Sequence, residues 1–198
     1  MIREWLAGRI AALPAPRHVI ATLVAQCNLA CSHCYWAHDL RDVTSRSWDS
    51  AIATIAEWGS ALTYAGRILS PEGARFIKRY IDVSGGKKPG IIDNGWTVMR
   101  HPDLLAQYEQ IAVSIDGEPA DHNLQRGKVG AFEKAWETVL ELKRRGFDPV
   151  VSSALSPISL RHWGAFEKRI LEHDIPLSTT LVWSLKETMA RGKACLDD

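Results

Sequence analysis

The sequence predicts an α/β fold in which parallel strands alternate with helices. Short apolar runs rich in β-branched residues alternate about six times with segments whose apolar residues recur at helical spacing. Cap residues or proline precede several of these segments, and glycine follows them. This alternation implies crossovers that gather the loops at the carboxyl ends of the strands on one face, where α/β proteins place their chemistry.

The first half of the chain contains three strand and helix units. Residues 18–26 have no polar alternation, which predicts a strand covered on both faces. A helix stripe begins after Ser47, and the next begins at Ser70 and Pro71, a cap residue and a first-turn proline. The predicted elements are a strand over 18–26, a helix over 47–59, a strand over 61–66, a helix over 72–83 and a strand over 90–96.

The second half continues the pattern. A short helix precedes the fourth strand, and a long amphipathic helix after it ends in a basic turn and Gly146. The predicted elements are a helix over 103–110, a strand over 111–117, a helix over 130–146, a strand over 149–155, a helix over 159–174 and a strand over 176–183. Partial barrels and doubly wound sheets both fit this order, and no glycine-rich phosphate fingerprint follows the first strand.

Composition predicts one soluble domain with short additions at both ends. Lysine and arginine total 24 against 23 aspartates and glutamates, which suggests neither a nucleic-acid partner nor a membrane partner. Arg9 interrupts the only candidate for a signal-peptide core, so we expect a cytoplasmic protein. We divide the chain into a helical extension over 1–17, a core over 18–184 and a tail over 185–198.

Three of the four cysteines lie in one loop, CNLACSHCYW at 27–36, directly after the first strand. A structural zinc site usually takes its ligands as two close pairs, and the fourth cysteine, Cys195, is distant in sequence. Thiolates of Cys27, Cys31 and Cys34 could instead bind three irons of a 4Fe–4S cluster and leave the fourth iron open.

The motif CxxxCxxC after the first strand, the segment Ser114-Ile115-Asp116-Gly117 and the later His122 and Arg126-Gly127 together resemble the radical S-adenosylmethionine superfamily. The resemblance covers about residues 18–183. It implies a partial (β/α)6 TIM-like barrel with a 4Fe–4S cluster on the three cysteines. The open iron would bind S-adenosylmethionine, and reductive cleavage would yield a 5′-deoxyadenosyl radical that abstracts hydrogen from a substrate. An electron donor such as flavodoxin or ferredoxin is implied as a partner.

The same resemblance implies which residues hold S-adenosylmethionine. His33 takes the place of an aromatic residue near the adenine, and Arg126 would pair with the methionine carboxylate. The remaining cofactor contacts that it implies are Ala65 and Gly66 after the second strand, Ser114 and Asp116 on the fourth, and Ser152 or Ser153 on the fifth.

One segment departs from the family pattern. Relatives usually carry Gly-Gly-Glu-Pro after the second strand, whereas this chain has Ala65-Gly66-Arg67-Ile68. A cation cannot hold the methionine ammonium group, so either that contact comes from backbone carbonyls, Asp93 or Asp116, or S-adenosylmethionine is held differently. We expect Arg67 to bind an anionic group of the substrate instead.

The other substrate candidates follow from their positions at strand ends or in the cysteine loop: Asp93, Asn94, Trp36, Trp96 and Trp183. Trp48, Trp58, Trp136 and Trp163 fall in predicted helices and are expected to pack against the sheet. The histidines outside the cysteine loop, His122 among them, lack ligand spacing, which favours solvated or capping roles.

The resemblance implies modification of a natural product or a peptide. An open side of the barrel would admit a large substrate or a partner protein. Two other classes remain: a catalytically silent iron–sulfur carrier or scaffold, and a zinc-stabilised binding module.

Overall fold

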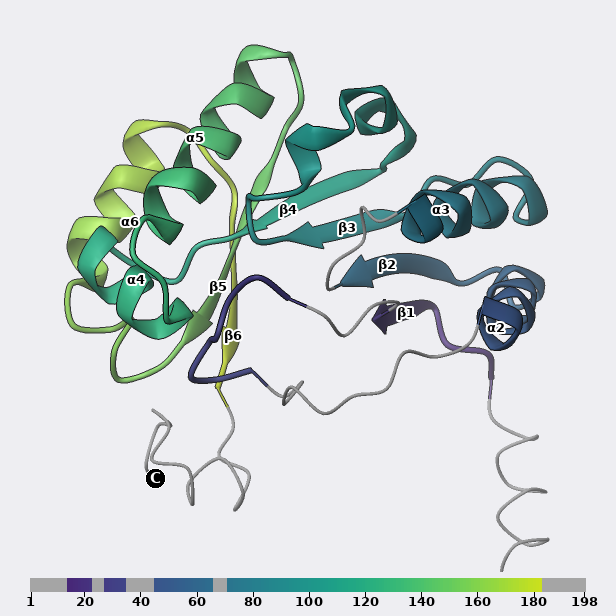
Figure 1. The fold of residues 1–198 in the computed structure, drawn as a ribbon, viewed down its shortest axis with the longest axis horizontal. Helices are drawn as coiled ribbons and strands as arrows, with labels where there is room; N and C mark the ends of the chain where they lie inside the picture. Colours follow the sequence, from purple (N-terminus) through teal and green to yellow (C-terminus); the bar gives the residue numbers. More distant parts are fainter. Residues whose placement is uncertain (1–13, 23–26, 35–44, 66–70, 183–198) are drawn as a thin grey trace, which may run out of the picture.

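The computed structural model of the protein describes residues 14–22, 27–34, 45–65 and 71–182, and the statements below concern these residues. Six strands form one sheet whose spatial order follows the chain, and every neighbouring pair is parallel. They are β1 (His18–Thr22), β2 (Ala61–Ala65), β3 (Gly90–Asp93), β4 (Gln110–Ser114), β5 (Val150–Leu155) and β6 (Leu177–Leu181). The sheet curls into a half-barrel (Figure 1), which confirms the predicted partial barrel.

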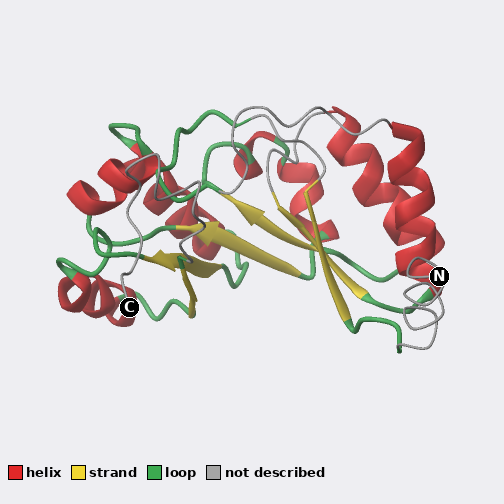
Figure 2. Cartoon of the chain, turned by 90° about the horizontal axis from the view of Figure 1, so that it is seen from below, coloured by secondary structure: helices red, strands yellow, loops and turns green. Residues whose placement is uncertain are grey.

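Helices follow the strands and lie on the outside of the curl (Figure 1). The α-helices are α2 (Ser45–Glu57), α3 (Pro71–Val83), α4 (Pro119–Arg126), α5 (Ala131–Arg144) and α6 (Trp163–Glu172). Two short 3-10 helices, η1 (Val98–Arg100) and η2 (Pro102–Gln107), join β3 to β4. Figure 2 shows how the strands fan out between the helices. No helix in the described ranges is both long and apolar enough to cross a bilayer.

The two faces of the sheet differ in chemistry, because successive side chains of a strand point to opposite faces. On the helix-covered face, Leu62, Tyr64, Ile91, Val113 and Val151 are at most 2% exposed. On the concave face the register places Ala65 beside Ile92 and Ser114 beside Ser152, and these side chains are only half-buried. Apart from Ile92, these side chains are small, and they leave space inside the half-barrel.

The prediction that the first strand is covered on both faces is wrong. Ile20 is 62% exposed, because β1 is an edge strand and Ile20 points to the concave face, which no described helix covers. The helix predicted to begin after Ser47 begins at Ser45 and ends at Glu57. Trp58 consequently lies beyond the helix and is 50% exposed, so it does not pack on the sheet as expected.

Other boundaries also shift. The last helix begins at Trp163 and not near residue 159, because Ser156 and Ser159 hydrogen-bond to each other in a turn that precedes it. The predicted α-helix over 103–110 is the 3-10 helix η2. Helix α4 was not predicted at all. The expected extension over 1–17 and the tail over 185–198 fall mainly outside the described residues, so this division stays a prediction.

Candidate functional site

The three loop cysteines border one cavity of about 200 Å³. Cys27 is exposed, and Cys31 and Cys34 are half-buried. The other lining residues are Asn28 and Leu29 of the same loop, residues at or after the carboxyl ends of β2, β3 and β4, and one residue of α4: Ala65, Ile92, Asp93, Asn94, Thr97, Ser114 and Arg126. The expected convergence of distant sequence features at this end of the sheet is thus found.

The end of α4 supports the cysteine loop. The last carbonyls of a helix lack intrahelical partners, and two of them accept bonds from the loop. The amide of Ser32 donates to the Gln125 carbonyl at 2.9 Å, and that of Ala30 donates to the Arg126 carbonyl at 3.3 Å. The buried Gln125 side chain donates in turn to the Ala154 carbonyl at 2.9 Å. The loop is therefore linked through α4 to β5.

Gly127 allows the loop to approach this closely. Its φ of +65° lies in the left-handed region, as is common after a helix. A Cβ atom at this position would lie 2.6 Å from the Ala30 carbonyl oxygen, a distance at which the loop would have to move. The Arg-Gly pair of the sequence motif therefore has a steric reason.

A turn after β3 directs Asn94 towards the loop. The Asp93 carboxylate accepts bonds from the amides of Gly95 at 2.7 Å and Thr97 at 3.3 Å, and from the Thr97 hydroxyl. Asn94 Nδ2 then lies 2.9 Å from Asn28 Oδ1 and 3.7 Å from Cys27 Sγ. Asp93 borders the cavity, but its carboxylate is occupied in organising this turn.

Asp116 and Arg126 form a buried ion pair beside Cys31. Arg126 donates to the carboxylate through Nε and Nη2, at 2.6 Å and 2.7 Å, and its Nη1 lies 3.9 Å from Cys31 Sγ. Burial alone would raise the pKa of Asp116, but the adjacent Arg126 guanidinium, together with His33 and His122, outweighs burial and lowers the pKa. Burial also raises the pKa of the Cys31 thiol, and Arg126 opposes that change.

His122 is not solvated, contrary to the expectation from its spacing. Its side chain is 1% exposed, and Nδ1 accepts the Asp116 amide at 3.0 Å. Burial lowers the pKa of His122 to about 4, which keeps the ring neutral near pH 7. It therefore positions the Asp116 backbone.

The other predicted residues fall in several places. Ser152 shares the concave face with Ser114, whereas the Ser153 hydroxyl points to the helix-covered side and donates to the Ile115 carbonyl. Among the described residues, the predicted site residues that do not line the cavity are His33, Asp116, Ser152, Ser153 and Trp96. Gly66, Arg67, Trp36 and Trp183 lie outside the described residues, as does Cys195.

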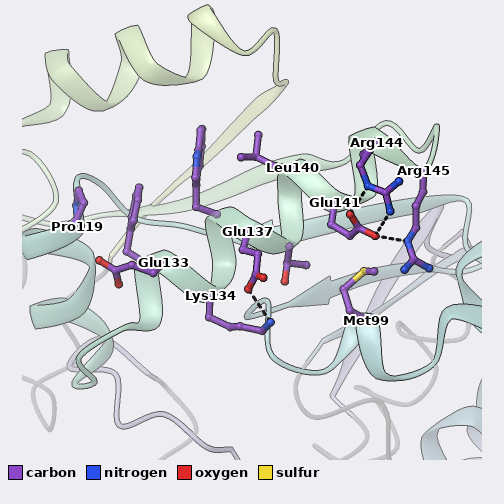
Figure 3. A pocket seen from close by; sticks show the side chains of 12 residues that line it. Met99, Pro119, Glu133, Lys134, Glu137, Leu140, Glu141, Arg144 and Arg145 are labelled. Carbon is purple, nitrogen blue, oxygen red and sulfur yellow. Dashed lines mark hydrogen bonds and ion pairs between the residues drawn. The ribbon is translucent and has the colours of Figure 1, made fainter.

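A second, larger hollow of about 860 Å³ lies along α5 (Figure 3). Most of its charged side chains are paired with one another, Lys134 with Glu137 and Glu141 with both Arg144 and Arg145. Glu133 accepts a hydrogen bond from the Asn123 amide group instead. It shares no lining residue with the cysteine cavity. We therefore place the candidate site at the smaller cavity, where the thiols are.

The donor set at this cavity fits an iron–sulfur cluster. In the described part of the chain no three ligating side chains converge on a single point, as one metal ion would require. A 4Fe–4S cluster does not require this, since each thiolate binds a different iron. The N–H groups of Asn94 and Arg126 near two of the sulfurs also suit thiolates, which accept hydrogen bonds.

Solved structures share this architecture. SuiB of Streptococcus suis bound to S-adenosylmethionine superposes with a TM-score of 0.74 at 13% identity, over 92% of this chain and 45% of that one. Native anSMEcpe with bound AdoMet gives 0.63 at 16% identity, over 82% of this chain and 51% of that one. Both are radical S-adenosylmethionine enzymes. The chain has the radical S-adenosylmethionine fold.

A sequence relative points the same way. Pre-heme d1 synthase of Dinoroseobacter shibae is 29% identical over 144 residues, which are 65% of this chain and 34% of that protein. No family model matches the chain. The chain thus spans about a third of this curated relative and about half of the solved structures. The resemblance inferred from the cysteine motif is confirmed for the radical S-adenosylmethionine fold.

Sequence reasoning missed two residues that support the cysteine loop. Gln125 and Lys128 were not singled out, and the Lys128 ammonium lies 4.4 Å from the centre of the Trp96 ring and 3.5 Å from the Asn28 carbonyl. Helix α4 is only eight residues long, and its buried side chains are polar, so a search for apolar periodicity does not find it. Pro119 at its start and Gly127 at its end were the available clues.

Proposed function

We propose that the protein is a radical S-adenosylmethionine enzyme whose cluster is bound by Cys27, Cys31 and Cys34. The observation that carries the proposal is that these cysteines border one cavity at the carboxyl ends of β2, β3 and β4. The bound 4Fe–4S cluster would supply the electron that cleaves S-adenosylmethionine to a 5′-deoxyadenosyl radical, which abstracts hydrogen from a substrate.

The chain's own residues would hold and orient these groups. Ser114 borders the cavity, and Ser152 lies beside Ser114 on the next strand. Their hydroxyls can therefore contact the ribose or methionine end of S-adenosylmethionine. Asp116 orients Arg126, whose third nitrogen remains near Cys31 at the cavity wall. Because Nε and Nη2 are bound to Asp116, a bond from Arg126 to the methionine carboxylate would come from Nη1. We therefore assign Asp116 a positioning role.

The concave face is the proposed place of the substrate. Its half-buried small and polar side chains leave room beside the cysteine cavity, and the side between β1 and β6 is open within the described residues. Arg67 would contribute a counter-charge to a carboxylate or phosphate of the substrate. A structure of anSMEcpe contains AdoMet together with a peptide, which supports a peptide or natural product as the substrate class here.

The proposed reaction also requires an electron donor and a reducing compartment. A one-electron donor of the flavodoxin or ferredoxin type must reach the cluster, and a partner protein could dock at the open side. A loop with three cysteines and an oxygen-sensitive cluster both favour a reducing compartment, so we propose the cytoplasm.

Anaerobic reconstitution tests the proposal. The wild type should take up about four irons and four sulfides per chain, and with dithionite and S-adenosylmethionine it should release 5′-deoxyadenosine. Replacement of Cys27, Cys31 or Cys34 by Ala should abolish both, while the matched change Cys195→Ala should preserve both. A protein with a full cluster but no 5′-deoxyadenosine would be a silent iron–sulfur protein. One zinc per chain and no iron would make it a zinc-stabilised module.

A further inference from the structure

We propose that Asn94 sets the reduction potential of the cluster by donating a hydrogen bond to the sulfur of Cys27. This inference rests on the proposed function, because it requires a cluster on the three cysteines. It gives Asn94 a role towards the cluster, where sequence position had suggested contact with the substrate.

Hydrogen bonds at both ends of its side-chain amide orient Asn94. Its Nδ2 lies 3.7 Å from Cys27 Sγ, within the range of an N–H donor to sulfur, and 2.9 Å from Asn28 Oδ1. Its Oδ1 accepts the Trp96 amide at 3.1 Å, which determines which end of the side-chain amide faces the thiol. The NH2 group therefore has one hydrogen for the sulfur and one for Asn28.

The turn that carries Asn94 is organised independently of the cysteine loop. Asp93 is 3% exposed, and its carboxylate accepts bonds from Gly95, Thr97 and Val98. Those contacts lie within β3 and the following turn. The segment after β3 therefore fixes the position of Asn94 without help from the cysteine loop.

A donor at this position favours the reduced cluster. Reduction adds an electron that increases the negative charge on the sulfurs, so an N–H bond to a ligating thiolate becomes stronger and raises the potential. Arg126 Nη1 provides a second donor, 3.9 Å from Cys31 Sγ, but its charge is matched by Asp116. Asn94 carries no charge, and its N–H group lies near Cys27, the most exposed of the three cysteines.

The test is a redox titration of the reconstituted protein with dithionite as the reductant. Electron paramagnetic resonance measures the fraction of reduced cluster at each potential. In Asn94→Ala the equilibrium constant for reduction should fall about tenfold, a shift of 59 mV to a more negative potential for a one-electron couple. Iron and sulfide content should equal that of the wild type. Asn94→Asp keeps an acceptor for the Trp96 amide but replaces the donor with a negative charge, so it should shift further in the same direction.

Asn28→Ala is the matched control. It removes the other partner of Asn94 and the Asn28 Oδ1 that lies 4.0 Å from Cys27 Sγ, but it leaves the Asn94 N–H group facing Cys27. No donor to the sulfur is lost, so the potential should not become more negative. Equal potentials in the wild type, Asn94→Ala and Asn94→Asp would overturn the inference, as would a shift in Asn28→Ala as large as that in Asn94→Ala. A wild type that binds no iron would instead overturn the proposed function, which the iron content detects before any titration begins.

Discussion

Arg126 donates two hydrogen bonds to the carboxylate of Asp116, from Nε to one oxygen at 2.6 Å and from Nη2 to the other at 2.7 Å. The Asp116 side chain is inaccessible, and that of Arg126 is 11% exposed. The Ala154 amide donates to the same carboxylate at 2.9 Å. One buried contact therefore joins β5, the segment after β4 and the helix that supports the cysteine loop.

Removal of one partner of this pair should be costly. In Asp116→Asn the Arg126 charge loses its counter-ion in a buried place, and the free energy of unfolding should fall by about 3 kcal/mol. Urea denaturation measures this. The control Glu137→Gln breaks the exposed pair with Lys134 and should cost about 0.5 kcal/mol or less. An equal decrease in the free energy of unfolding in the two variants would show that the buried pair contributes no more to stability than an exposed one.

His122 should make stability depend on pH. Its pKa is lowered from 6.5 to about 4 in the folded protein, so between these values the unfolded chain binds more protons than the folded one. Stability should therefore decrease as the pH falls from 6.5 to 4, by up to about 3 kcal/mol. Chemical denaturation at a series of pH values measures the slope.

The variant His122→Asn tests whether this residue causes that slope. Asparagine offers an acceptor near the position of Nδ1 for the Asp116 amide but does not titrate. The decrease between pH 6.5 and 4 should be largely absent in the variant. Persistence of the full slope would assign it to other groups. Asp116 does not interfere in this window, because its pKa lies below the ordinary 3.8 and its contribution is lost only at lower pH.

Gly127 offers a test of how α4 supports the loop. Both Gly127→Ala and Gly130→Ala place a side chain at a positive φ, which costs about 1 kcal/mol. Only at Gly127 would the new Cβ meet the Ala30 carbonyl, since nothing lies within 4 Å of the one at Gly130. Iron uptake should consequently drop in Gly127→Ala and remain normal in Gly130→Ala. Normal uptake in both would mean that the loop is positioned in another way.

Arg67 carries a prediction made from the sequence. If it binds an anionic group of the substrate, Arg67→Ala should change the affinity for S-adenosylmethionine by no more than a few-fold. Isothermal titration of the reconstituted protein measures this. A loss of about 100-fold, or about 2.7 kcal/mol, would place Arg67 on the cofactor instead.

The sequence was sufficient to predict the fold class and the gathering of three cysteines at one end of the sheet, because both depend on strong local signals. Apolar periodicity identified all six strands, and the spacing of Cys27, Cys31 and Cys34 identified the loop. The side chains around the loop were harder to predict. His122 and Gln125 lie on the buried face of α4, which is polar, so apolar periodicity did not identify this helix. The Asp116–Arg126 pair forms because α4 turns the chain back and brings Arg126 to Asp116. Ile20 was misjudged because the exposure of an edge strand depends on how far the sheet closes.

The most direct test of the account is the electron paramagnetic resonance spectrum of the reduced, reconstituted protein with and without S-adenosylmethionine. Three cysteine ligands leave one iron of the cluster open, so saturating S-adenosylmethionine should bind there and change the spectrum, in the wild type and in Cys195→Ala alike. A spectrum that is identical with and without S-adenosylmethionine would contradict the assignment of this site as a radical S-adenosylmethionine centre.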